Sequence, residues 1–225
     1  MEQKLFEERL SRLRVLMASR GLDAFVTYVA EGYNWEGLYY LSNFRGTAGA
    51  LVVTSEDPLL IVDGRYCNQA RQQSPYPVHL QESGNFFQTL QEVLEKFGVN
   101  RVGFEGNRIS YGDYRKLSNM PFWWDDAGDM LSALERQKGI FEIQIIRKAI
   151  ELAQKGFMRS LEKVSSSMTE RQYAALLEFF LRTEGAEGFA FEPVVASGLR
   201  SALPHGRATD KLFSPGEWVV VDFGA

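Results

Sequence analysis

The sequence predicts an α/β domain over residues 1–127 and a second, α+β segment over residues 128–225. Three observations support this division. Strand-like and helix-like patterns alternate through the first part, which implies a sheet that is covered by helices and at least partly parallel, because parallel neighbours need a crossover between them. From Ile140 a single apolar stripe continues for about six helical turns. Residues 217–225 then place four bulky apolar residues in front of Asp222 and a glycine-containing turn.

The first part begins with an amphipathic helix and continues as alternating strands and helices. A helix over residues 2–20 is predicted because apolar residues recur at steps of one, three and four, at Leu5, Phe6, Leu10, Leu13, Leu16 and Met17. Gly21 supplies its stop. Further patterns predict strands at 23–29, 48–54, 58–62, 76–80, 101–105 and 122–125, a hairpin-like turn at 55–57, and helices at 64–73, 86–97 and 111–119.

The second part is mainly helical before it ends in strands. A short linking helix is predicted at 130–137, and the long helix from Ile140 is expected to end at the serines of 165–167. Thr169 is expected to cap the helix that continues through 173–182. The remaining residues predict a strand-like stretch at 189–195, a loop at 197–206, a turn at 214–216 and the last strand.

Composition indicates a folded, soluble protein. Of the 225 residues 45% are hydrophobic, the net charge is -4, and the basic residues are scattered among the acids. We therefore expect neither nucleic acid nor an anionic membrane surface as a partner. The single cysteine, Cys67, excludes an internal disulfide and a thiolate zinc site. The charged N-terminus is unlike a signal peptide, and no run approaches the roughly 20 apolar residues of a membrane span, so the expected location is the cytoplasm.

Asp222 is the first candidate for chemistry. A strand that delivers a carboxylate to a glycine-containing turn suits a ligand of a divalent metal, since the strand fixes the oxygen and glycine lets other ligands approach. The alternative is a carboxylate that caps the next turn. One oxygen does not make a metal site, because a hydrolytic pair of metals needs bridging carboxylates and usually a histidine. Both interpretations stay open on spacing alone.

His205 is the second candidate. It lies in a loop between Pro204, which fixes the entry of the chain, and Gly206, which permits an unusual exit. An imidazole held in this way suits hydrogen bonding to a reacting oxygen, because an immobilised donor loses less entropy when it engages. The alternative is a loop histidine in water. The other histidine, His79, lies in an alternating strand and is expected to be structural or exposed.

Three further features are explained as well by structure as by function. Ser197 and Ser201 lie near His205, but neither has the Gly-x-Ser-x-Gly surroundings of a serine hydrolase nucleophile. Arg65 follows an Asp-Gly turn, and turn chemistry accounts for that arrangement. Aromatic residues around Trp35 occupy a loop-like stretch, where core packing competes with an interface or a pocket wall.

Motifs along the whole chain resemble one protein family. They are Tyr40-Leu41-Ser42-Asn43-Phe44-Arg45-Gly46, Val62-Asp63-Gly64-Arg65-Tyr66, Arg136-Gln137-Lys138 with Glu142-Ile143 and Arg147-Lys148-Ala149, Ala196-Ser197-Gly198 with Ser201-Ala202-Leu203-Pro204-His205-Gly206, and Val221-Asp222-Phe223-Gly224-Ala225. In order and spacing these five motifs resemble the creatinase, prolidase and aminopeptidase P family. Five motifs in sequence are far more specific than any one of them.

The resemblance implies a creatinase-type N-terminal α/β domain with a mixed sheet, followed by the first half of a pita-bread α+β catalytic domain. In peptidases of this family two divalent ions, commonly manganese, cobalt or zinc, are held by two aspartates, a histidine and two glutamates. Asp222 matches the first aspartate. His205 matches the histidine that stabilises the tetrahedral intermediate and helps bind the scissile peptide. Dimeric relatives imply a homodimer, in which the region of Trp35 reaches toward the neighbouring subunit's pocket.

The resemblance also places the other four metal ligands beyond Ala225. We therefore expect a chain truncated within the catalytic domain, which binds no stoichiometric metal pair and is inactive alone. The apolar strand at Trp218–Val221 would lack part of its cover, which predicts poor solubility or association.

The leading hypothesis is the N-terminal portion of a metal-dependent Xaa-Pro dipeptidase, which cleaves the bond before proline in a dipeptide or short peptide. The dipeptidase is favoured because the compact N-terminal domain resembles that of bacterial prolidases. The alternatives are an aminopeptidase P that acts on longer peptides, a metal-free creatinase-type amidinohydrolase, and a non-catalytic binding pseudoenzyme.

Overall fold

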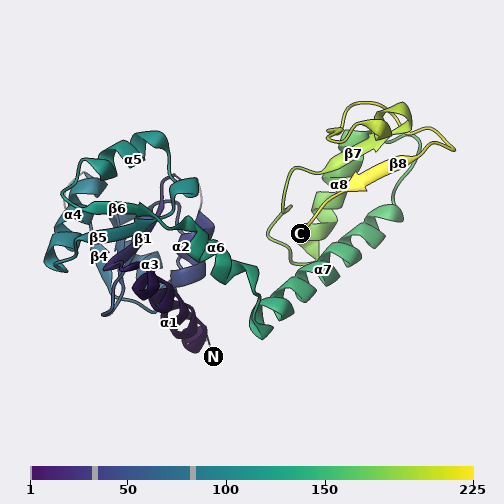
Figure 1. Ribbon diagram of the computed structural model, residues 1–225. Helices are drawn as coiled ribbons and strands as arrows, with labels where there is room; N and C mark the ends of the chain where they lie inside the picture. Colours follow the sequence, from purple (N-terminus) through teal and green to yellow (C-terminus); the bar gives the residue numbers. More distant parts are fainter. Residues whose placement is uncertain (1, 32–34, 82–84) are drawn as a thin grey trace. The chain divides into compact units, whose positions relative to one another are not determined.

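The computed structural model of the chain describes residues 2–31, 35–81 and 85–225 (Figure 1). The chain divides into two compact units, Met1–Gln137 and Lys138–Ala225. Helix α6 (Gly128–Arg136) lies on the first unit's side of this division, and three of its residues join that unit's core. The domain boundary near residue 127 stays a prediction.

The sheet of the first unit is mixed, as predicted. Its strands in spatial order are β4 (Val78–Leu80), β3 (Leu59–Val62), β2 (Gly49–Val53), β1 (Ala24–Val29), β5 (Arg101–Phe104) and β6 (Trp123–Asp126). Strand β2 pairs antiparallel with both β1 and β3, whereas the pairs β1–β5, β5–β6 and β3–β4 are parallel. The consecutive parallel strands β3–β4 and β5–β6 are joined through helices, as parallel pairing requires.

Helices cover both faces of this sheet, because side chains alternate between the faces along each strand. Phe25 and Val29 of β1 belong to one core, and Ala24 and Val26 belong to the other. The first core is covered by α1 (Glu2–Arg20), α2 (Trp35–Ser42), α3 (Cys67–Gln73) and α6, and the second by α4 (Phe86–Lys96) and α5 (Tyr111–Ser118). A strand buried on both faces explains why residues 23–29 are almost continuously apolar.

The stretch around Trp35 is helical, and its expected loop is therefore wrong. Helix α2 starts at Trp35, and its Leu38 and Leu41 are fully buried at helical spacing. At Gly37 a Cβ would lie 2.8 Å from the Glu105 carboxylate oxygens, so glycine allows the helix to approach that side chain closely. The neighbouring residue Asn34 lies outside the described residues.

The second unit packs α7 (Ile140–Leu161) along α8 (Glu170–Thr183), and α8 in turn contacts β7 (Val194–Ser197) (Figure 1). Gly156 allows the close approach of the two helices, since a Cβ there would lie 2.7 Å from Leu181 Cδ2. Tyr173 of α8 joins them further, because its hydroxyl lies 2.9 Å from Ser160 Oγ of α7.

Thr169 caps α8 as predicted. Its hydroxyl accepts a hydrogen bond from Gln172 N at 3.1 Å, and the Gln172 side chain accepts one from Thr169 N at 2.9 Å. The two bonds form a capping box, which satisfies backbone donors that the first helical turn leaves unpaired. The start of α8 is therefore encoded locally.

The strand expected at residues 189–195 is shorter than predicted. Strand β7 starts only at Val194, because Pro193 has no N–H to give to a ladder. Its partner β8 (Val219–Asp222) runs antiparallel to it. Val195 and Val221 form a cross-strand pair that packs with Tyr173 and Phe213 in the core of this unit.

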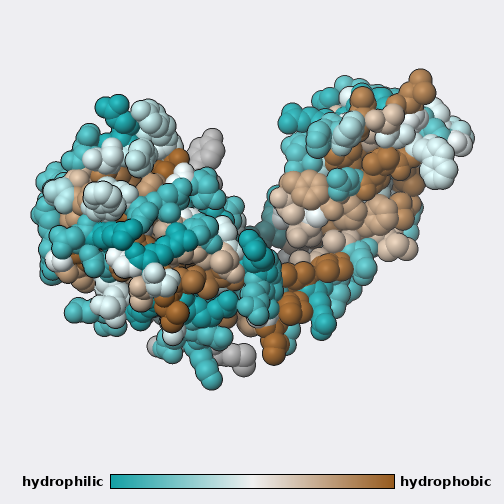
Figure 2. Space-filling model, in the orientation of Figure 1, coloured by the Kyte–Doolittle hydropathy of each residue, from teal (hydrophilic) through white to brown (hydrophobic). Residues whose placement is uncertain are grey.

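An apolar surface extends over the second unit, where brown side chains gather along α7 and around β8 (Figure 2). On α7 the exposed members are Ile140, Ile143, Ile145, Ile146, Ile150, Met158 and Leu161. Trp218 is 85% exposed just before β8, and Val219 and Val220 are each about 40% exposed. Among the described residues, these side chains of α7 and of the segment at 218–220 are therefore left largely exposed.

Candidate functional site

Asp222 ends β8 on the face of the two-stranded sheet that points away from α8. Its register partner is Val194, and the adjacent pair Val195 and Val221 packs toward Tyr173 of α8. Because neighbouring residues of a strand point to opposite faces, Asp222 points away from that core. Its side chain is exposed, so the structure leaves the carboxylate accessible to a ligand.

The backbone that follows Asp222 is held on both sides. The ring of Phe223 stacks on Phe157 of α7 at 5.3 Å between centroids, and the carbonyl of Gly224 accepts a hydrogen bond from Ala190 N at 3.0 Å. These contacts restrict the strand end and with it the position of the carboxylate.

His205 lies in an exposed turn beside β7. Gly206 N donates to the Leu203 carbonyl at 3.2 Å, and Arg207 N donates to the His205 carbonyl at 2.9 Å. Gly206 is buried against β7, where a Cβ would lie 2.8 Å from the Cβ of Ala196. Glycine is therefore needed for close approach, and the imidazole beside it reaches solvent.

The two predicted site residues flank β7 from opposite edges. Val194 pairs with Asp222 on one edge and forms a bridge to Arg207 on the other. Two strand spacings separate Arg207 from Asp222, or about 10 Å between Cα atoms. His205 precedes Arg207 by two residues, so it lies on the Arg207 side of β7, and no hydrogen bond joins its side chain to that of Asp222 among the described residues.

A buried carboxylate, Glu170, supports this arrangement from the first turn of α8. Its Oε1 accepts hydrogen bonds from Ser197 N at 2.8 Å and Ser197 Oγ at 2.9 Å. Its Oε2 accepts from Thr209 N at 3.0 Å, Thr209 Oγ1 at 2.7 Å and Arg200 Nε at 3.1 Å. The side chain is fully buried, and each oxygen is directed at a different segment of the chain.

The pKa of Glu170 is lowered to about 2. Burial by itself raises the pKa of a carboxyl, but here the donors from Thr209 and Ser197 outweigh it by stabilising the charged form. Arg200 supplies a compensating positive charge. The carboxylate is therefore ionised throughout the neutral range.

Lys211 extends the network to the turn before β8. Its Nζ donates to Ser197 Oγ at 2.8 Å and to Glu217 Oε1 at 2.6 Å. The pKa of Glu217 is lowered, first by its hydrogen bond with Lys211. Each of the two acids is thus paired with a base, Glu170 with Arg200 and Glu217 with Lys211. The one fully buried charge of the four, that of Glu170, is therefore compensated.

The roles of Glu170, Arg200 and Lys211 were not predicted from the sequence. Glu170 lies in the first turn of α8, directly after the N-cap Thr169, where an acid is common because of the helix dipole. Nothing local distinguishes it from an exposed acid. Its partners at 197, 200 and 209 are distant in the sequence, so only the fold identifies the cluster.

The described residues contain no group of three or more histidine, cysteine, aspartate or glutamate side chains that could hold a metal ion. Asp222 therefore has no cluster of further acidic, histidine or cysteine side chains around it among these residues. A carboxylate oxygen suits a hard divalent ion, but a site for such an ion needs several oxygen or nitrogen ligands, and Asp222 offers one carboxylate. In the same described part of the chain, no helix is long and apolar enough to cross a membrane.

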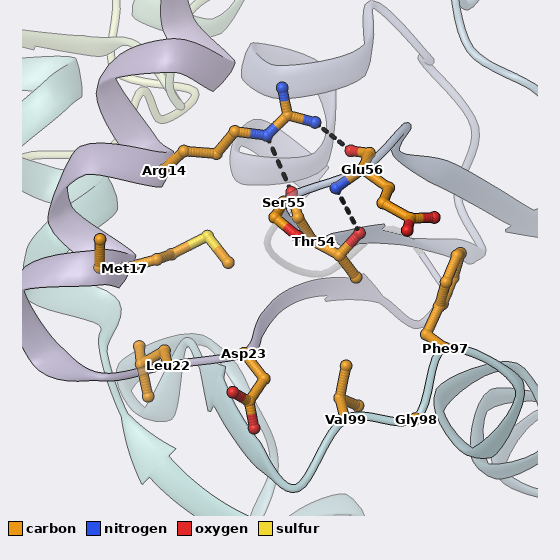
Figure 3. Close-up of a pocket in the computed structure, with 11 residues that line it drawn as sticks. Arg14, Met17, Leu22, Asp23, Thr54, Ser55, Glu56, Phe97, Gly98 and Val99 are labelled. Atoms are coloured by element: carbon orange, nitrogen blue, oxygen red, sulfur yellow. Dashed lines mark hydrogen bonds between the residues drawn. The ribbon is translucent and has the colours of Figure 1, made fainter.

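A pocket of about 370 Å³ in the first unit has Arg14, Asp23 and Thr54 on its wall, and no buried side-chain atom without a hydrogen-bond partner among the described residues belongs to its lining (Figure 3). Arg14 Nε donates to the Thr54 carbonyl at 2.8 Å, and its terminal nitrogen donates to the Glu56 carbonyl. Asp23 accepts hydrogen bonds from the backbone of Asn100 and Arg101. Arg14 thus joins α1 to the turn after β2, and Asp23 joins the start of β1 to that of β5, which indicates a structural role for both residues.

Comparisons with known proteins match both halves of the chain. Residues 9–122 match the Creatinase/Prolidase N-terminal domain, and residues 144–225 match Metallopeptidase family M24. An uncharacterized peptidase, YqhT, of Bacillus subtilis is 34% identical over 96% of this chain and 61% of its own length. A Xaa-Pro dipeptidase of Pyrococcus horikoshii is 31% identical over 98% of this chain and 61% of its own.

Solved structures agree on the fold. A Xaa-Pro dipeptidase from Bacillus anthracis aligns with a TM-score of 0.90 at 30% identity, over 98% of this chain and 61% of that protein. An X-Pro aminopeptidase from Thermotoga maritima aligns with a TM-score of 0.87 at 34% identity, over 96% of this chain and 60% of that protein. The chain spans about 61% of the length of the curated relatives it matches. The expected α/β architecture is confirmed, and the chain belongs to the creatinase/prolidase family, with a creatinase-type N-terminal domain followed by an M24 metallopeptidase segment.

Proposed function

We propose that the chain is the N-terminal portion of a metal-dependent Xaa-Pro dipeptidase that hydrolyses the peptide bond before proline. The observation that carries this proposal is the pairing of β7 with β8, which presents Asp222 and the His205 turn on one small sheet within the M24 segment. The substrate would be a proline-containing dipeptide or short peptide. Relatives named as Xaa-Pro dipeptidases support this choice.

In this proposal Asp222 is a metal ligand. Two divalent ions of manganese, cobalt or zinc would be held by a protein of the relatives' full length, and they would supply Lewis-acid activation of water and of the scissile carbonyl. Asp222 contributes one carboxylate oxygen from a strand end whose backbone is fixed by Phe223 and Gly224. The 225 residues supply no complete ligand set among those described, so we expect no stoichiometric metal pair in this chain alone.

His205 is the proposed catalytic and substrate-binding group. The imidazole donates a hydrogen bond to the carbonyl oxygen of the scissile peptide, and this bond strengthens as the oxygen gains negative charge. Its exposed position leaves that face open to a peptide. The buried neighbour Gly206 and the bonded turn limit its movement, which reduces the entropy lost on binding.

An aminopeptidase that acts on longer peptides is the second candidate. The X-Pro aminopeptidase of Thermotoga maritima shares 34% identity with this chain, which is higher than the 30% of the Bacillus anthracis dipeptidase structure. Both activities use the same bond before proline, so the length of the peptide separates them. We also propose a homodimer, as the family resemblance implies, and a location in the reducing cytoplasm, which the single cysteine favours.

The test compares the 225-residue chain with a gene product of the relatives' full length. Each is assayed with manganese against a Xaa-Pro dipeptide and a Xaa-Pro-containing tripeptide, and bound metal is measured by mass spectrometry. We expect turnover of the dipeptide, and metal binding, in the longer product only. The variant Asp222→Asn should lose metal, whereas Asp210→Asn, which changes an exposed surface acid, should not. Failure of the longer product to cleave either peptide would overturn the proposal.

A further inference from the structure

The turn that carries His205 is clamped at both ends by one residue, Arg200. The Arg200 carbonyl accepts a hydrogen bond from Leu203 N at 3.0 Å, at the entry to the turn. The Arg200 guanidinium donates from its terminal nitrogen to the Arg207 carbonyl at 2.7 Å, at the exit. The segment between these contacts contains Pro204, His205 and Gly206, so movement of Arg200 would move the imidazole.

Arg200 is itself held by Glu170. Its Nε donates to Glu170 Oε2 at 3.1 Å, and the same oxygen accepts two hydrogen bonds from Thr209, just beyond the turn. The other oxygen holds Ser197 at the end of β7. One carboxylate therefore ties together the strand before the turn, the clamp across it and the chain after it.

Only a carboxylate satisfies this set of neighbours. The groups directed at Glu170 are all donors, two at one oxygen and three at the other. An ionised carboxylate is acceptor-only, whereas an amide of the same shape would turn N–H groups toward donors on one side. The result would be unpaired buried groups next to Thr209 and Arg200, or next to Ser197.

We propose that Glu170 is a positioning residue for His205, and that it acts through the Arg200 clamp. The catalytic consequence rests on the proposed peptidase function, but the positioning itself does not. Replacement of the carboxylate should release the 203–209 segment while the rest of α8 stays packed, because Tyr173 and Leu181 of that helix are buried independently of the cluster. If Glu170 had only a general structural role, its replacement would instead lower the order of the whole second unit evenly.

The first experiment measures local order in the 225-residue chain. Glu170→Gln removes the carboxylate, Arg200→Lys keeps the charge but has no paired nitrogens to bridge Glu170 and Arg207, and Glu178→Gln is the matched control. Glu178 lies on the same helix in an exposed pair with Arg182. The readouts are amide hydrogen exchange at Leu203, Gly206 and Thr209 and the imidazole NMR signals.

We expect exchange at those three amides to rise on the order of tenfold or more in both cluster variants, with little change at the buried amides of α8. The His205 imidazole signals should shift or broaden while those of His79, the only other histidine, stay unchanged. The control should match the parent. Unchanged exchange and unchanged His205 signals in Arg200→Lys, a variant that keeps the charge pair, would overturn the inference even where Glu170→Gln fails to fold.

The second experiment uses the gene product of the relatives' full length. Glu170→Gln should lower kcat/KM on the order of 100-fold, because a small displacement of a catalytic group has effects of that size. In a His205→Ala background the same substitution should have little further effect, since both act through one imidazole. Additive losses would refute action through His205. An inactive parent would refute the proposed peptidase function and leave the NMR result to decide the positioning.

Discussion

Glu105 is a buried acid whose titration should be visible in the stability of the first unit. It follows β5, is 5% exposed and faces Gly37 of α2, while its Oε2 has no hydrogen-bond partner among the described residues. Burial raises its pKa to about 7. The neighbouring Thr27 hydroxyl and the charge of Arg108, whose Nε lies 3.5 Å from Glu105 Oε1, offset only part of this rise. We predict that Glu105→Gln stabilises the protein at alkaline pH.

The sign and size follow from the two pKa values. The folded state keeps the proton up to about pH 7, whereas the unfolded chain loses it near its ordinary value of 4.5, so the free energy of unfolding falls as the pH rises between them. From pH 5 to pH 8 this fall amounts to about 2.5 kcal/mol. Glutamine carries no charge at either pH, and Arg108 keeps its ion pair with Glu135 at 3.0 Å.

Urea unfolding at pH 5 and pH 8, followed by tryptophan fluorescence, measures the effect. Three of the four tryptophans, Trp35, Trp123 and Trp124, lie in the first unit, so the signal reports mainly on it. At pH 5 the free energy of unfolding of Glu105→Gln should be nearly that of the parent, and at pH 8 it should be higher by about 2 to 3 kcal/mol. Glu95→Gln, on the exposed side of α4, is the control. An equal difference at both pH values would refute the raised pKa.

Three further predictions concern the second unit and the first. Gly156→Ala should destabilise the α7–α8 pair by about 1 to 2 kcal/mol, because the added methyl carbon would lie 2.7 Å from Leu181 and this clash outweighs the gain in helix propensity. Thermal unfolding of the variant and the parent measures the difference. Gly112→Ala, in α5 with only a contact at 3.8 Å, should instead stabilise by about 0.5 to 1 kcal/mol, and a loss there would contradict the argument. The lowered pKa of the Glu170 carboxylate should contribute about 3 kcal/mol to the free energy of unfolding above pH 4.5, and this contribution should be lost toward pH 2. In acid unfolding, the stability of Glu170→Gln should therefore fall less steeply with pH than that of the parent.

The elements and their buried faces could be predicted from the sequence because periodicity is a local property. The apolar steps of residues 2–20 correspond to α1, Gly21 ends that helix with a φ of 64°, and Thr169 caps α8. The motifs also predicted the family, since each is a short run of residues that can be recognised without knowing what surrounds it. Gly37 shows the limit of prediction from local patterns. Glycine is needed at this position to make room for the carboxylate of Glu105, which lies 68 positions further along the chain.

The candidate site divides in the same way. Asp222 and His205 were predicted from local patterns, a strand end and a Pro-His-Gly loop, and their roles stay proposals. What only the tertiary structure decided is how these two segments are held. Glu170 meets Ser197, Arg200 and Thr209 across 27 to 39 residues of sequence, and the pairing of β7 with β8 sets the spacing of the site. Hydrogen bonds between distant segments leave no periodic trace along the chain. The sequence by itself therefore determined the elements and pointed to two candidate side chains, and only the fold shows the network that surrounds the His205 turn.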